Sequence, residues 1–158
     1  METPIRYEIQ KLSPADVPPF DLLLLADETI PAIEKYICVS DSYVVYIAGN
    51  TQPIAVFVLY RLNDKEVEIK NIAVAKKSQG NGIGSWLLKE IKKLTRAAGY
   101  QYLLVGTADV GYRQQQFYLR NGFEQSGIRK GFFTENYPEP IYEKGKRLKD
   151  MVLFKAKL

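Results

Sequence analysis

Three closely spaced glycines between an expected strand and an expected helix constrain the fold of this chain most. Val67–Ala75, which reads VEIKNIAVA, is expected to be a strand. It runs directly into Lys76–Ser85, which reads KKSQGNGIGS. Apolar residues then recur at helical spacing before Gly99, namely Ile83, Leu87, Ile91, Leu94 and Ala98. A strand, a tight glycine turn and a helix in this order predict an α/β layer.

Apolar patterns on both sides of this unit predict further elements. We expect strands at Ile5–Leu12, Ser42–Ala48, Ile54–Arg61, Tyr100–Thr107, Phe123–Ile128 and Leu148–Lys155. We expect helices at Phe20–Glu28, Pro31–Val39 and Tyr112–Asn121, and a long loop over Arg129–Arg147. The order of these elements predicts a mixed sheet with helices on both faces. The length of 158 residues favours one domain, residues 1–158.

The absence of histidine removes several kinds of chemistry. The chain has no His and a single Cys, Cys38. A Ser-His-Asp triad, a Cys-His dyad and a His-ligated zinc are therefore excluded, and we expect no metal site. Proton transfer would need Glu, Asp, Tyr, Lys or bound water. A lone Cys cannot form an internal disulfide, so we expect a reducing, cytoplasmic location.

Charge and hydropathy limit the kinds of partner that this protein can have. The net charge of +4 favours an anionic ligand but is too small to indicate nucleic acid by itself. The N-terminal residues contain no apolar signal segment, and the apolar run Phe20–Ala26 is too short to span a bilayer. We expect neither a nucleic-acid partner nor a membrane partner.

The glycine loop has the features of an anion site. Without a Cβ, Gly80, Gly82 and Gly84 would allow a phosphate to approach backbone N–H groups closely. The N-terminus of the following helix would add a partial positive charge. Lys76 and Lys77 lie at the start of the glycine loop and add positive charge. A pyrophosphate cradle and a tight turn that uses glycine only for steric reasons fit the spacing equally well.

Two familiar phosphate-binding motifs do not match this loop. A Walker A loop requires Lys-Ser or Lys-Thr after its last glycine, whereas Ser85-Trp86 follows Gly84. A dinucleotide fingerprint requires G-x-G-x-x-G, whereas the spacing here is G-x-G-x-G. Both classes are disfavoured.

The sequence Ile72–Leu88, IAVAKKSQGNGIGSWLL, resembles the acyl-CoA motif of the GNAT superfamily of N-acyltransferases. Its signature, Gln/Arg-x-x-Gly-x-Gly/Ala, is matched by Gln79, Gly82 and Gly84. Gln115–Glu124, QQFYLRNGFE, resembles the second motif of the family, with Tyr118 before Gly-Phe. The resemblance implies a GNAT-like fold: a central mixed, mostly antiparallel sheet of about seven strands, splayed in the middle, with helices on both faces.

The resemblance also implies a cofactor, acetyl-CoA, and the residues that bind it. The pyrophosphate would lie on the loop and the first helical turn, formed by Gln79, Gly80, Asn81, Gly82, Ile83, Gly84 and Ser85. The pantetheine arm would pair with the backbone of Ile72, Ala73 and Val74. Asp109 stands where the family often has an Asn that contacts CoA, and an ionised Asp cannot donate a hydrogen bond.

Two side chains are candidates for catalysis. The resemblance implies that Tyr118 protonates the departing thiolate. The alternative is a helix residue packed beside Phe117 and Phe123 with its hydroxyl in solvent, and the motif favours the catalytic role. An amine with a pKa of about 10 must lose a proton before it attacks. Glu68, on the strand that leads into the loop, is the candidate base. Ordered water is the alternative base, and a Glu68–Lys70 surface ladder is the alternative role for this carboxylate.

The resemblance places the acceptor beside Phe20–Val39 and Arg129–Arg147. Aromatic and acidic residues in the second segment suit a cationic or amine-bearing acceptor, although the aromatics could instead pack the loop or a homodimer contact. The implied activity is direct transfer, in a ternary complex, of an acetyl group from acetyl-CoA to a primary amine of a small molecule or peptide. The alternative is a catalytically silent domain that binds or senses acyl-CoA.

Overall fold

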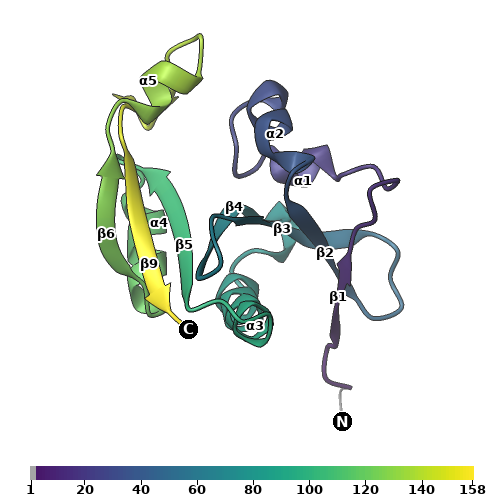
Figure 1. The fold of residues 1–158 in the computed structure, drawn as a ribbon. Helices are drawn as coiled ribbons and strands as arrows, with labels where there is room; N and C mark the ends of the chain where they lie inside the picture. Colours follow the sequence, from purple (N-terminus) through teal and green to yellow (C-terminus); the bar gives the residue numbers. More distant parts are fainter. Residues whose placement is uncertain (1–2) are drawn as a thin grey trace. The chain divides into compact units, whose positions relative to one another are not determined.

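The structure is a computed structural model that describes residues 3–158. The chain forms two compact units. The first unit contains the residues up to Tyr60 together with Lys70–Trp86, and the second contains Arg61–Ile69 together with Leu87–Leu158. Strand β4 (Glu66–Val74) and helix α3 (Ile83–Ala97) each contribute residues to both units (Figure 1).

The main sheet has seven strands in the order β1-β2-β3-β4-β5-β9-β6. Besides β4, its strands are β1 (Tyr7–Lys11), β2 (Asp41–Ile47), β3 (Pro53–Arg61), β5 (Tyr102–Ala108), β6 (Glu124–Arg129) and β9 (Met151–Lys157). Strand β4 pairs with β5 in parallel, whereas β1/β2, β2/β3, β5/β9 and β6/β9 are antiparallel. The expected mixed, mostly antiparallel sheet is confirmed.

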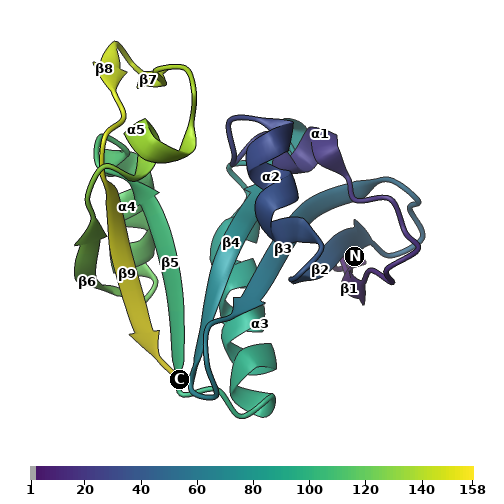
Figure 2. The ribbon, with the colours of Figure 1, turned by 45° about the horizontal axis from the view of Figure 1, so that its top comes forward.

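In the first unit, two helices cover an apolar core. Helices α1 (Phe20–Leu23) and α2 (Ile30–Ile37) lie close together (Figure 2). The Thr29 side chain caps α2 by accepting a hydrogen bond from the Ala32 N–H at 3.2 Å, and a proline stands at the start of the helix, as the sequence predicts. The core of this unit consists of Leu22, Leu23, Ile33, Ile37, Val44, Val56, Val58 and Ala73.

The first helix is shorter than predicted. Its expected range was Phe20–Glu28, but α1 ends at Leu23. The following N–H groups, from Leu25 to Asp27, donate to the carbonyls of Leu22 and Leu23, so the chain continues as tight turns. The Asp27 carboxylate then accepts the Glu28 N–H at 2.7 Å, so helical pairing does not resume over the rest of the expected range.

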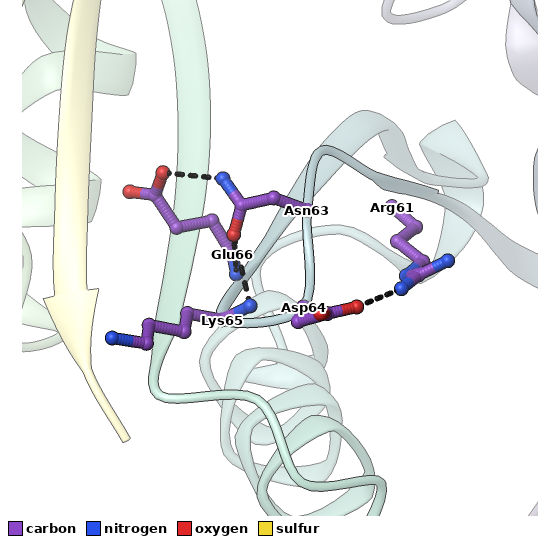
Figure 3. A network of polar contacts seen from close by, with 5 residues as sticks. All are labelled: Arg61, Asn63, Asp64, Lys65 and Glu66. Atoms are coloured by element: carbon purple, nitrogen blue, oxygen red, sulfur yellow. Dashed lines mark hydrogen bonds and ion pairs between the residues drawn. The ribbon is translucent and has the colours of Figure 1, made fainter.

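A side-chain-supported turn joins β3 to β4 (Figure 3). The Asn63 Oδ1 accepts the N–H groups of Lys65 and Glu66 at 2.8 and 2.9 Å, and its Nδ2 donates to the Glu66 carboxylate at 2.9 Å. Arg61 and Asp64 form an ion pair beside it. Because an Asn side chain can imitate a backbone turn, Leu62–Glu66 forms a turn here.

In the second unit, helix α4 (Tyr112–Arg120) packs on one face of the neighbouring strands (Figure 1). The ring of Tyr118 lies 6.0 Å from that of Phe154 on β9 and 5.5 Å from that of Phe123. The buried residues of this face are Leu103, Val105, Val152, Phe154 and Ala156. Their alternation along β5 and β9 is the expected period of two.

The prediction of an irregular loop over Arg129–Arg147 is wrong. This segment forms helix α5 (Phe132–Asn136) and a two-stranded hairpin of β7 (Tyr142–Glu143) and β8 (Lys146–Arg147), drawn in Figure 2. Lys144 and Gly145 both have positive φ, 49° and 77°, which is the backbone of the tight hairpin turn that matches strand twist. The sequence signal was this Lys-Gly pair, which is weaker than Asn-Gly.

Among residues 3–158, no helix has both the length and the hydropathy needed to cross a bilayer.

Candidate active site

The glycine loop has the backbone geometry that an anion site needs. After a short 3-10 turn, η1 (Lys76–Ser78), Gly80 and Gly82 have φ values of 80° and 77°. Residues other than glycine rarely adopt this backbone conformation. No atom lies within 4 Å of where a Cβ would stand at either glycine. The space above both residues is therefore open. Glycine is needed at both positions because of the positive φ, and not to avoid a clash within the protein.

The N-terminus of α3 offers backbone donors to this space. The first hydrogen bond of the helix runs from the Trp86 N–H to the Gly82 carbonyl at 3.1 Å. The N–H groups of Ile83, Gly84 and Ser85 precede it and have no carbonyl of the helix to bind. Because the loop from Gln79 to Gly82 is exposed, these donors and the helix dipole can meet an anion from solvent. The exposed side chains of Lys76 and Lys77 add positive charge nearby.

The end of β4 supports the loop. The Gln79 side chain donates to the Val74 carbonyl at 2.9 Å and so ties the loop to the last residue of the strand. Ala73 is buried in the apolar core, whereas Ile72 and Val74 are half-buried. The sequence predicts that the backbone of Ile72, Ala73 and Val74 pairs with the pantetheine arm, and this stays a prediction.

Tyr118 lies in α4. Its side chain is buried and surrounded by aromatic rings, with Phe117 at 5.3 Å in addition to Phe123 and Phe154. Burial raises the pKa of its phenol above the ordinary value of about 10. Tyr118 is therefore neutral at physiological pH and can donate a hydrogen bond. Full loss of its proton is harder than in an exposed tyrosine.

Glu68 lies in β4 with only 2% of its side chain exposed, and Arg129 at the end of β6 forms an ion pair with it at 2.9 Å between Nη2 and Oε1. The sequence did not predict this partner, because Arg129 is far along the chain and nothing near it signals a buried carboxylate. The alternative role, a surface ladder with Lys70, does not suit a carboxylate that is 2% exposed. The Lys70 ammonium lies over the Tyr60 ring at 5.3 Å.

Strand register assigns Glu68 and Tyr118 to opposite faces of the second unit. Glu68 is paired with Leu104 in β5. Leu104 shares its face with Gly106, which is paired with Leu153. Phe154, against which Tyr118 packs, is the next residue and points to the other face. A base at Glu68 and a donor at Tyr118 would therefore act from the two sides of these strands.

Asp109 is used within the second unit. Its N–H donates to the Asp150 carbonyl at 2.9 Å, and its Oδ1 accepts the Lys149 N–H at 3.3 Å. The carboxylate therefore fastens the end of β5 to the beginning of β9. The proposed contact of Asp109 with CoA stays a prediction.

The aromatic residues of the segment after β6 differ in exposure. Phe133 and Tyr137 are buried and their rings stack at 5.8 Å, so these two pack the segment itself. Tyr142 is 62% exposed. Cys38 is exposed at the end of α2.

A buried polar network in the first unit was missed by the sequence reasoning. The Asn71 side chain, 4% exposed, donates to the Leu23 carbonyl at 3.0 Å and to the Tyr36 hydroxyl at 3.1 Å. Tyr36 in turn donates to the Asp27 carboxylate at 3.1 Å. The only signal was a polar residue at a position of β4 whose neighbours on the same face, Ile69 and Ala73, are apolar. This network joins β4 to both α1 and α2.

Within the described part of the chain, no group of three or more His, Cys, Asp or Glu side chains could hold a metal ion.

The chain is similar to known proteins of one family. Residues 40–125 match the family model described as an acetyltransferase (GNAT) domain. The matched stretch is more than half of the chain and includes β4, the glycine loop and Tyr118. The chain therefore belongs to the GNAT family of acetyltransferases, and the resemblance seen in its motifs is confirmed.

Individual relatives extend the match to nearly the whole chain. A Bacillus subtilis (strain 168) protein named YvbK, described as an uncharacterized N-acetyltransferase, is 32% identical over 133 residues, 84% of each chain. A GNAT family acetyltransferase from Elizabethkingia anophelis, solved with acetyl-CoA bound, is 38% identical with a TM-score of 0.90, covering 96% of this chain and 98% of that chain. A Bacillus subtilis acetyltransferase solved in complex with CoA is 29% identical with a TM-score of 0.84, covering 98% and 99%.

Proposed function

We propose that this protein is an acetyl-CoA-dependent N-acetyltransferase that acetylates a primary amine of a small molecule or peptide by direct transfer in a ternary complex. The observation that carries the proposal is the glycine loop: positive φ at Gly80 and Gly82, open space above both, and unused N–H groups at the start of α3. These donors suit a pyrophosphate. The acetyl-CoA bound to the Elizabethkingia anophelis relative and the CoA bound to the Bacillus subtilis relative support this ligand.

The reaction is an acyl transfer that balances without a metal or an acyl-enzyme. The amine nitrogen attacks the thioester carbonyl, a C–N bond forms, and the C–S bond breaks. The amine loses one proton to a base, and the thiolate of CoA gains one. No residue has to act as a nucleophile, which suits a chain without His whose single Cys lies exposed at a helix end.

We assign Glu68 as the base. It is a carboxylate in β4, eleven residues before the first residue of the glycine signature, Gln79, and Arg129 holds its orientation at 2.9 Å. A general base must be positioned before its pKa matters. Since Glu68 is 2% exposed, its carboxylate would act through a local opening or through an ordered water.

We assign Tyr118 as the group that stabilises the departing thiolate. Because burial raises the pKa of its phenol, complete proton transfer to a thiolate, with a pKa of about 8.5, would run uphill. A hydrogen bond from the phenol to the sulfur carries no such cost. Tyr118 therefore serves as a hydrogen-bond donor, and solvent completes the protonation.

The two compact units act as one acetyltransferase domain. Residues 40–125, which match the family model, run through both units, and this supports the interpretation.

A thiol-release assay tests the proposal. Purified protein and acetyl-CoA are incubated with polyamines, amino acids, aminoglycosides, and peptides with a free N-terminus or lysine, and CoA is measured over time. Release of CoA together with the acetylated amine, found by mass spectrometry, is the expected result. Tight acetyl-CoA binding with no transfer to any amine would instead support the alternative, a silent acyl-CoA-binding or sensing domain.

A further inference from the structure

Arg129 has hydrogen-bond donors left over after its contacts with the protein. A guanidinium carries five N–H groups. Within residues 3–158 the structure gives Arg129 two partners: the Glu68 carboxylate at 2.9 Å and the Met151 sulfur at 3.7 Å. Sulfur is a weak acceptor. The side chain is 34% exposed, so the remaining donors can meet a ligand without any rearrangement of the backbone.

The surface around Arg129 makes an ionic contact effective. Arg129 is paired with Met151 across β6 and β9, and Met151 lies over Gly106 of β5, where a side chain would collide with it. The guanidinium therefore lies against the Met151 side chain, and about two-thirds of the Arg129 side chain is removed from water. Charge interactions are stronger in such a setting than at a fully exposed site.

The other charges on this face do not compete for Arg129. Glu66 and Lys155 form their own ion pair at 2.8 Å. Glu68 is the acidic partner of Arg129, and a single guanidinium can bind two carboxylates along different edges. Lys157 lies six residues along β9 from Met151, about 20 Å at the rise of a strand, so its charge is screened from Arg129.

We propose that Arg129 binds the carboxylate of the acceptor, and that the acceptor is an α-amino acid acetylated on its amine. A guanidinium matches the geometry of a carboxylate through two parallel hydrogen bonds. An α-amino acid carries a positive amine next to a negative carboxylate. Arg129 is exposed enough to take the carboxylate, and the amine would then lie near Glu68, which is 2% exposed and is reached through an ordered water or a local opening. The reaction remains the acyl transfer described above, with Glu68 as the acceptor of the amine proton, so this inference rests on the proposed function.

Paired acceptors test the inference. Each amino acid is compared with the amine that lacks only its carboxylate: phenylalanine with phenethylamine, leucine with 3-methylbutylamine, and lysine with cadaverine. For at least one pair, the wild-type protein should have a kcat/KM about 10- to 100-fold higher for the amino acid, the factor expected of a charged hydrogen bond. The readout is this ratio, because a general effect of a substitution on the base cancels in it.

Variants then test whether Arg129 is the residue that causes the preference for the amino acid. In Arg129→Gln the ratio of kcat/KM for the amino acid to that for the amine should fall to about one. Arg129→Lys keeps the charge but loses the two parallel N–H donors of the guanidinium, so the ratio should fall several-fold. Lys130→Gln is the matched control, since it removes an exposed positive charge next in the chain and should leave the ratio unchanged. Circular dichroism checks that each variant is folded, and Arg129→Lys serves if Arg129→Gln is not.

The outcomes separate the two proposals. Acetylation of amines and amino acids with equal kcat/KM, or a preference that survives in Arg129→Gln, would overturn the role of Arg129 and leave the transferase function intact. Absence of transfer to both members of every pair, with transfer to another amine of the thiol-release panel, would overturn the α-amino acid acceptor alone. Absence of transfer to every amine of both sets, with acetyl-CoA bound, would overturn both proposals. A preference that collapses in Arg129→Gln and persists in Lys130→Gln is the result that supports the inference.

Discussion

Met151 lies directly over Gly106, so closely that the sulfur of Met151 occupies the place of a side chain at residue 106. The two residues belong to paired strands, β9 and β5, and share a face. The missing Cβ lets Met151 lie flat, and this places its sulfur beside Arg129. A glycine inside a strand is thus explained by close packing, and the packing supports the ion pair of Glu68.

Gly106→Ala should therefore destabilise the protein. The added methyl group must displace the sulfur end of Met151. Because that side chain is flexible, the cost in unfolding free energy should lie at the low end of overpacking, about 1 kcal/mol. Urea unfolding measures this cost. Gly127→Ala is the matched control, because its Cβ would meet only Leu153 at an ordinary 3.7 Å. If Gly106→Ala costs as much in a Met151→Ala background as in the wild type, the clash is not the cause.

Gly82→Val should abolish acetyl-CoA binding without unfolding the domain. A valine would strain the backbone at φ 77° and place methyl groups in the open space where the pyrophosphate is expected. Isothermal titration calorimetry with acetyl-CoA measures the loss. Gly49→Val is the control, since Gly49 has φ 87°, is equally open, and lies in the turn between β2 and β3. Retained affinity in Gly82→Val would refute the cradle.

Tyr118→Phe should lower kcat by about 100-fold while the Kd for acetyl-CoA changes little. The ring and its packing against Phe123 and Phe154 are kept, and only the hydroxyl is removed. Burial raises the pKa of this phenol, so it stays protonated as the pH rises through 10, and no part of the pH–rate profile below 10 should come from Tyr118. Equal loss of binding and turnover, or no loss of turnover, would count against the assigned role.

Glu68→Gln should lower kcat by about 100-fold or more, because the amide cannot accept the amine proton. Glu66→Gln is a close control, because Glu66 also lies in β4 and also has a basic partner. Glu66 pairs with Lys155 at 2.8 Å, and Glu68 pairs with Arg129 at 2.9 Å. Steady-state kinetics with a saturating amine would compare them. Similar rates for the two variants would indicate that ordered water is the base.

Asn71→Ala should destabilise the protein by about 2 kcal/mol, because it leaves the Leu23 carbonyl and the Tyr36 hydroxyl without their buried donor. Tyr36→Phe should cost about half as much, since Asn71 keeps its bond to Leu23. Thermal unfolding of both variants and of the double variant gives their coupling. Additive costs would show that Asn71 and Tyr36 do not form one network.

Local patterns predicted most of the strands and helices to within a few residues. Helix α3 begins at Ile83, as the apolar stripe predicts, and ends one residue earlier than expected. The largest error lay between β6 and β9, where α5 and a hairpin replace the expected loop. Leu94 belongs to the apolar stripe but is 36% exposed, because the spacing of apolar residues does not show how much of the helix the rest of the protein covers.

The sequence by itself determined the family, the glycine loop and the candidates Tyr118 and Glu68. These follow from local spacing, since a turn with positive φ and a helix start depend on residues near each other in the chain. Only the tertiary structure decided that Arg129 pairs with Glu68 and that Asn71 joins β4 to two helices. Such partners are brought together by strand register and burial, which depend on the whole fold and leave no mark in the spacing of the sequence.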